Sequence, residues 1–202
     1  MVLKVTLVGH SYVRRLMEFR VMSEREEDAS TISVDGMQMS LEFVHKGGTG
    51  YEFYNSSEAL KARILKSKPD VILVILGGNG VSSKANIPDV SKEMRKFHEW
   101  LRENCPSAII IAAESEPRYN LNLHDHLGNP VESYYLRRNA FNQALKRMRS
   151  KDFVLRTANY LNHRYFYTKN GVHLNARGNR YYWGMIKDCL GKVLDKYGLR
   201  TV

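Results

Sequence analysis

The sequence has little cysteine, no long apolar run and no secretory-signal pattern at its first residues, and each absence narrows the class of protein to expect. Its 202 residues include only two cysteines, Cys105 and Cys189. They lie far apart without the spacing of metal ligands, so we expect two reduced thiols. No apolar stretch approaches the length of a membrane span, and the amino-terminal residues lack the charged, apolar and small-residue regions of a secretory signal. We therefore expect an intracellular protein, cytoplasmic or nuclear, or a domain excised from a longer protein.

Linkers, internal repeats and low-complexity tracts are also missing from the sequence. The length suits one domain over residues 1–202, and 43% of the residues are hydrophobic, enough for a substantial core. The unusual quantity is a formal net charge of +10. Such a charge favours an anionic partner, whether nucleic acid, an anionic lipid surface or a negatively charged substrate, and does not choose among them.

Apolar runs alternate with amphipathic segments along the chain. Runs without polar alternation, of which residues 71–76 are the clearest, predict strands covered on both faces. The predicted strands are residues 5–8, a hairpin within 31–44, 71–76, 108–113 and 153–155. The predicted helices are residues 12–19, 56–66, 88–104, 131–149 and 174–197. This alternation indicates an α/β protein, with a parallel sheet and helices on both of its faces.

Two of these helices carry more specific expectations. The helix over 131–149 is expected to turn one stripe of residues toward the core. That stripe is Leu136, Ala140, Ala144 and Met148. The helix over 174–197 is expected to be interrupted at Gly178 and Gly184.

Ser11 stands where the first predicted strand gives way to a helix. Open α/β sheets hold their ligands at the carboxyl ends of their strands. A helix amino-terminus there also offers unpaired N–H groups and a positive dipole to an anion. By position alone, Ser11 is either a nucleophile or simply the N-cap of the helix.

Three further loops fall at the same edge of the predicted sheet. They are a glycine-rich segment over 47–50, the Gly77-Gly78-Asn79 segment, and residues 170–173, which end in His173. Together with Ser11 they supply a hydroxyl, backbone N–H groups, a side-chain amide and an imidazole. Those groups are what acyl transfer needs: a nucleophile, oxyanion donors and a general base.

In this order the four segments resemble the SGNH (GDSL-type) hydrolase superfamily, whose blocks contribute Ser, Gly, Asn and His. The resemblance implies a flavodoxin-like three-layer α/β/α sandwich with a central sheet of about five parallel strands. It also implies esterase or lipase-like hydrolysis of a small ester or acylated substrate, without a metal or organic cofactor. By the same resemblance Ser11 is the nucleophile and His173 the base. The oxyanion hole would combine the N–H groups of Ser11 and Gly48 (or Gly50) with the Asn79 amide.

Two positions depart from the pattern of that superfamily. His10 replaces the usual Asp before the nucleophile, which is expected to alter support of the turn more than the reaction. Asn170 replaces the catalytic Asp three residues before His173. An amide cannot stabilise an imidazolium, and in a serine protease the same exchange costs about 10⁴ in turnover. Either another carboxylate serves, or a backbone carbonyl orients His173 in a dyad, or activity is much reduced.

Plainer interpretations of these residues stay open. Ser11 could be only an N-cap, and His173 only a structural histidine. The glycines over 47–50 could cradle a phosphate, but the Gly-Lys-Ser/Thr ending of a P-loop is missing. His124 and His126, in a long polar loop over 114–130, have no third metal ligand nearby in the sequence.

A non-enzymatic function is the alternative. The chain would then be a weak or inactive SGNH-like domain that binds RNA or DNA through a basic surface, since domains resembling this superfamily accompany nucleic-acid machinery in mobile elements such as retrotransposons. The candidate contacts are Arg137, Arg138, Lys146, Arg147 and Arg149.

Overall fold

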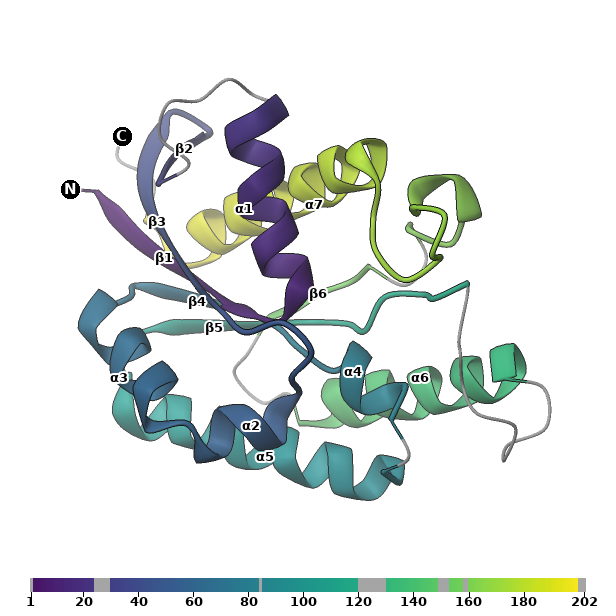
Figure 1. Cartoon of the computed structure of the whole chain (residues 1–202). Helices are drawn as coiled ribbons and strands as arrows, with labels where there is room; N and C mark the ends of the chain where they lie inside the picture. Colours follow the sequence, from purple (N-terminus) through teal and green to yellow (C-terminus); the bar gives the residue numbers. More distant parts are fainter. Residues whose placement is uncertain are drawn as a thin grey trace.

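A computed structural model describes residues 2–23, 30–83, 85–119, 130–148, 153–157 and 160–199. Six strands form one sheet in the order β2-β3-β1-β4-β5-β6 (Figure 1). Their bounds are β1 (Leu3–Gly9), β2 (Thr31–Val34), β3 (Met37–His45), β4 (Val71–Ile75), β5 (Ile109–Ala113) and β6 (Phe153–Leu155). Five of the strands are parallel, as predicted.

The sixth strand, β2, pairs antiparallel with β3 at the edge of the sheet. The predicted hairpin is therefore confirmed. Its turn residues Asp35 and Gly36 both have positive φ, at 50° and 80°. A two-residue turn with positive φ at both positions matches the twist of the strands that it joins. Aspartate and glycine adopt positive φ more readily than most residues, which explains why this pair forms the turn.

Helices cover both faces of the sheet, so the expected three-layer α/β/α fold is confirmed (Figure 1). One face carries α1 (Ser11–Ser23) and α7 (Ala176–Lys196). The other carries α2 (Tyr51–Ser56), α3 (Glu58–Ser67), α5 (Ile87–Asn104) and α6 (Pro130–Arg147). Two short helices, α4 (Gly78–Val81) and the 3₁₀ helix η2 (Arg164–Phe166), were not expected from the sequence, and neither was α2.

The central strands contribute alternately to two apolar cores. Leu7 and its neighbour Leu73 pack under α1 and α7, whereas Val8 and Val74 pack under the helices of the opposite face. All four side chains are buried. Because both faces of these strands are covered, the sequence shows unbroken apolar runs instead of alternation.

Helix α7 runs without interruption, so the predicted breaks at its glycines are wrong. Asn175 caps its first turn by accepting the N–H of Gly178. A Cβ built at Gly178 would lie 2.2 Å from the carbonyl oxygen of Phe166, whereas one at Gly184 meets nothing within 4 Å. Gly178 therefore permits close approach of backbone, and does not end the helix.

Helix α6 is rotated relative to its predicted inner face. Leu136 is 66% exposed and Ala140 is also exposed, whereas Ala144 and Met148 are partly buried against the core as predicted. Tyr134, Phe141 and Leu145 are fully buried. Tyrosine and phenylalanine bury more apolar area than leucine and alanine do, so the aromatic side of the helix faces the core. Arg138 lies on that aromatic side and is buried with it.

The cysteines and the lengths of the helices bear on two expectations from the sequence, reduced thiols and the lack of a membrane span. Cys105 and Cys189 are free thiols, the first buried and the second partly buried. Among the helices in the described part of the chain, none is long and apolar enough to cross a membrane.

Candidate active site

The carboxyl ends of β1 and β4 meet in the middle of the sheet. The chain leaves β1 toward β3 on one side and later returns to β4 on the other, so this is the topological switch point of the sheet. Ligands of open α/β sheets bind at such points. Ser11 follows β1 and Asn79 follows β4, which places both at this edge.

Ser11 is the first residue of α1 and not its N-cap. His10 takes the capping place, because its Nδ1 accepts the N–H of Tyr12 at 3.4 Å. The Ser11 hydroxyl is thereby left for another partner, and its Oγ lies 3.1 Å from Nε2 of His173. Residues 162 positions apart in the chain thus form a serine–histidine pair.

The loop that carries His173 is tied down on both sides. The hydroxyl of Tyr12 donates to the carbonyl oxygen of Val172 at 2.6 Å, which joins the loop to α1. The N–H of Tyr119 donates to the carbonyl oxygen of Gly171 at 2.7 Å, which joins it to the segment after β5. These contacts hold the imidazole over the first turn of α1.

Asn170 determines which nitrogen of His173 carries the proton. Its Oδ1 accepts the N–H groups of Val172 and His173 at 2.9 and 3.2 Å and the Thr168 hydroxyl at 2.7 Å. This orientation turns Nδ2 of Asn170 toward Nδ1 of His173, 3.1 Å away. An amide nitrogen only donates, so Nδ1 accepts and the proton of the neutral ring lies on Nε2. The ring then donates to Ser11, the reverse of what a general base requires.

His173 is uncharged at neutral pH. Its pKa is lowered to about 4, first by partial burial and then by the positive charges of Arg15, Arg118 and Arg14, in that order of importance. A neutral imidazole can serve as a base once its proton is on Nδ1.

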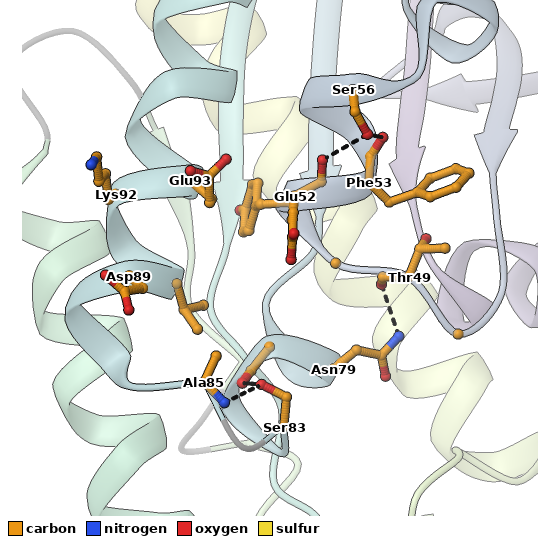
Figure 2. A pocket seen from close by; sticks show the side chains of 15 residues that line it. Thr49, Glu52, Phe53, Ser56, Asn79, Ser83, Ala85, Asp89, Lys92 and Glu93 are labelled. Atoms are coloured by element: carbon orange, nitrogen blue, oxygen red, sulfur yellow. Dashed lines mark hydrogen bonds between the residues drawn. The ribbon is translucent and has the colours of Figure 1, made fainter.

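Asn79 is held by hydrogen bonds at both ends of its carboxamide. Its Nδ2 donates to the carbonyl oxygen of Thr49 at 2.9 Å (Figure 2). Its Oδ1 accepts from Nη2 of Arg118 at 2.9 Å. The preceding Gly77 has φ of 115°, and a Cβ there would lie 2.6 Å from the ring of Phe141. Only glycine permits this turn, which directs α4 toward the switch point.

A pocket of about 770 Å³ opens beside Asn79, between α2, α4 and α5 (Figure 2). Gly48 and Gly50 both line it, so the structure brings the glycine-rich loop to Asn79 and leaves the choice between the two glycines open. Ser11 and His173 are not among the lining residues. Carboxylates of Glu52, Asp89 and Glu93, with the partly exposed ring of Phe53, form much of the wall.

Arg118 belongs to the site and was not selected from the sequence. It is 6% exposed, and besides Asn79 it contacts Oγ of Ser82, at 2.7 Å from Nη1. In the sequence it is one of several charged residues in a long polar segment after a strand. Its place at the carboxyl end of β5, on the edge that carries Ser11, was the only available signal.

His10 is buried and uncharged. Burial is the main cause of its low pKa of about 3, with smaller contributions from the charge of Arg118 and from His173, which is protonated at such acid pH. Its Nε2 has no hydrogen-bond partner within the described ranges. At the turn its Nδ1 accepts the N–H of Tyr12, and the expectation that it affects the turn more than the reaction stays a prediction.

The basic surface expected on α6 is not assembled as predicted. Arg138 is buried and its guanidinium lies 4.7 Å from the ring centroid of Tyr135. The guanidinium of Arg137 donates to the carbonyl oxygens of Val81, Ser83 and Ala85. Lys146 pairs with the buried carboxylate of Glu114 at 2.7 Å, Arg147 is exposed, and Arg149 lies outside the described residues. The rotation of α6 is the reason, since it turns Arg138 toward the core.

The metal interpretation of His124, Asp125 and His126 falls on residues outside the described part of the chain. Within the described ranges, no group of three or more His, Cys, Asp or Glu side chains could hold a metal ion.

Comparison with solved structures identifies the fold as that of the SGNH hydrolases. A psychrotrophic esterase from Pseudoalteromonas sp., inhibited by monoethylphosphonate, superposes with a TM-score of 0.64 at 11% identity, over 95% of this chain and 98% of that one. A family 3 carbohydrate esterase from Talaromyces cellulolyticus superposes with a TM-score of 0.64 at 15% identity, over 96% of this chain and 99% of that one. A GDSL-like lipase from Bacteroides thetaiotaomicron superposes with a TM-score of 0.64 at 12% identity, over 96% of this chain and 88% of that one. Sequence comparison finds no matching family model and no matching curated protein.

Proposed function

We propose that this protein is a serine ester hydrolase of the SGNH type, with Ser11 as nucleophile and His173 as its base. The observation that carries the proposal is the 3.1 Å contact between Ser11 Oγ and His173 Nε2, at the switch point of the sheet. Nucleophile and base within hydrogen-bond reach are the signature of covalent acyl transfer. The esterases and lipases with the same fold support this choice of reaction.

The reaction begins when Ser11 attacks the ester carbonyl and transfers its proton to Nε2 of His173. The proton of the neutral ring must first move to Nδ1, which faces a donor, Nδ2 of Asn170. Rotating the Asn170 amide would offer Oδ1 to that proton but give up the two backbone N–H groups it now accepts. We therefore propose a slow hydrolase, in which a minor orientation of Asn170 supports catalysis.

The carbonyl oxygen becomes an oxyanion, which needs donors. Ser11 N–H at the start of α1, the N–H of Gly48 or Gly50, and the second N–H of the Asn79 amide supply them. The pocket beside Asn79 takes the non-reacting part of the substrate, and the carboxylates of Glu52 and Asp89 in its lining favour groups that carry hydroxyls.

Hydrolysis of p-nitrophenyl acetate and butyrate by wild type and Ser11→Ala tests the proposal. Ser11→Ala should reduce kcat by at least about 10³-fold, since the serine and histidine act as a unit. Ser107→Ala is the control, because Ser107 is exposed and precedes β5 at the opposite edge of the sheet. Equal turnover in wild type and Ser11→Ala would refute Ser11 as nucleophile.

A second measurement does not require turnover. An activated organophosphonate ester should attach covalently to Ser11, which mass spectrometry of the peptide carrying Ser11 would locate. Labelling elsewhere, or equal labelling of Ser11→Ala, would contradict the proposal.

A further inference from the structure

We propose that Arg118 is the positioning residue of the oxyanion hole: it orients the carboxamide of Asn79 and places a buried positive charge behind it. This inference rests on the proposed hydrolase function and assigns a role to a residue outside the four sequence blocks. The argument depends on its contacts, on the space made for it, and on the charge around it.

The guanidinium binds α4 at two points. Nη2 donates to Oδ1 of Asn79 at 2.9 Å, and Nη1 donates to Oγ of Ser82 at 2.7 Å. Ser82 in turn donates to the carbonyl oxygen of Gly78 at 2.9 Å. A planar fork with two acceptors fixes direction as well as distance. With Oδ1 held by Arg118, Nδ2 must face the opposite way, where Thr49 takes one of its hydrogens.

The local sequence leaves room for this arginine. A Cβ at Gly78 would lie 2.9 Å from Nη2 of Arg118 and 3.5 Å from Nε2 of His10. Any side chain at position 78 would therefore displace the guanidinium or the Asn79 turn. Glycine at this position permits Arg118 to lie directly against the backbone of α4.

The imidazole of His10, which lies near Arg118, does not neutralise the charge of the guanidinium. His10 stands where the superfamily usually has aspartate, and burial keeps it neutral, with a pKa of about 3. Within the described residues, the buried Glu116 is a carboxyl whose charge interacts with that of Arg118. Its pKa is raised to about 7 by burial, and it accepts the hydroxyl of Tyr182 at 2.9 Å. At neutral pH, Arg118 is thus at most partly neutralised.

A cation bonded to an amide oxygen increases the positive character of the amide hydrogens. The ester carbonyl carries little charge in the ground state, whereas the tetrahedral intermediate carries a full negative charge. Arg118 therefore stabilises the transition state more than bound substrate, and its loss should appear in kcat more than in KM.

The kinetic test compares Arg118→Gln, Arg118→Lys and Arg137→Gln, each in wild type and in Asn170→Asp. Arg118→Gln should lower kcat on the order of 10²-fold with KM changed less than about threefold, the size expected for a lost oxyanion donor. The kcat of Arg118→Lys should lie between those of wild type and Arg118→Gln, because lysine keeps the charge but offers no planar fork. Arg137 is the matched control, since its contacts among the described residues are with the backbone carbonyls of Val81, Ser83 and Ala85 on the same segment, and not with Asn79.

Two further readouts separate positioning from simple stability. Arg118 lowers the pKa of His173, so Arg118→Gln should shift the acid limb of kcat/KM to higher pH, while Arg14 and Arg15 remain. The side-chain amide resonances of Asn79 in ¹⁵N–¹H spectra should move upfield and broaden in Arg118→Gln, and stay in place in Arg137→Gln.

An equal loss of kcat in Arg137→Gln, or a loss that resides in KM, would overturn the proposal. So would Asn79 resonances that do not move in folded Arg118→Gln or Arg118→Lys. If no variant hydrolyses any ester, the proposed function fails separately, and the Asn79 resonances still decide whether Arg118 positions this amide.

Discussion

Asn170 and aspartate have almost the same shape, yet they place the proton of His173 on different nitrogens. In the present turn Oδ1 accepts two backbone N–H groups, and Nδ2 faces Nδ1 of His173. An aspartate could keep one oxygen on those N–H groups and present the other to a proton on Nδ1. Ser11, His173 and Asn170 therefore have the arrangement of a triad, in which the nitrogen Nδ2 of Asn170 stands where aspartate would have an oxygen.

Asn170→Asp should accordingly raise kcat for p-nitrophenyl acetate, by up to about 10⁴-fold, the factor lost by the reverse change in a serine protease. The carboxylate would hold the proton on Nδ1 and stabilise the imidazolium. Asn162→Asp adds the same charge at an exposed residue whose Oδ1 accepts the hydroxyl of Tyr135, with no hydrogen bond to His173 among the described residues, and should leave kcat nearly unchanged. An unaltered kcat in Asn170→Asp would mean that another group already orients His173.

The pH dependence of kcat/KM should reflect the low pKa of His173. In the proposed mechanism the neutral ring of His173 is the base, so activity should be constant at neutral pH and fall as pH drops through about 4. In Asn170→Asp the neighbouring negative charge favours the imidazolium, so the pKa rises and the acid limb moves to higher pH. Profiles measured on both proteins would check this, and identical limbs would argue against His173 as the titrating group.

At the scale of elements, α7 supports the histidine loop through backbone contact. Its first turn lies against η2, where Gly178 faces the carbonyl oxygen of Phe166. The loop between them bears His173, and the bridge between Tyr167 and Leu174 closes it. Packing between α7 and η2 thus contributes to the position of His173.

Two glycines of α7 should respond oppositely to alanine. Gly178→Ala forces a Cβ into backbone and should lower the free energy of unfolding by about 1–3 kcal/mol or more. Gly184→Ala meets open space and should raise it by about 0.5–1 kcal/mol, because glycine is unfavourable inside helices. Urea denaturation of both variants measures this, and equal effects would contradict the packing described for Gly178.

At the scale of the whole molecule, one sheet is shared by two apolar cores. Trp183 is buried in the core under α1 and α7, and Trp100 packs against the core of the opposite face. Since β1 and β4 supply side chains to both cores, neither core can be lost without disturbing strands that the other needs.

We therefore expect Leu7→Ala and Ile72→Ala, one on each face, to destabilise the same unfolding transition by about 2–5 kcal/mol each. Fluorescence of single-tryptophan variants, Trp100→Phe and Trp183→Phe, would report each core separately. Coincident midpoints would support one domain over the whole chain. Separate midpoints, with only one moved by each substitution, would indicate two units.

Local pattern determined most of the fold. Buried strands such as β4 have uninterrupted apolar sequence, and β–α alternation restricts how parallel strands connect. The places of Ser11, Asn79 and His173 at one edge follow from that alternation, since each comes after a strand or just before the last helix. The short α2 and α4 have too few residues for a periodic signal.

Tertiary structure decided the orientation of polar and aromatic groups. The inner face of α6 depended on which side chains bury most area against its neighbours, and Tyr134 and Phe141 outweighed Leu136. The role of Arg118 depended on a contact with Asn79 across 39 positions of sequence. The proton of His173 depended on the direction of the Asn170 amide, which three hydrogen bonds to its Oδ1 determine. Sequence spacing gives the identity of such groups, but their hydrogen bonds exist only once the loops are brought together.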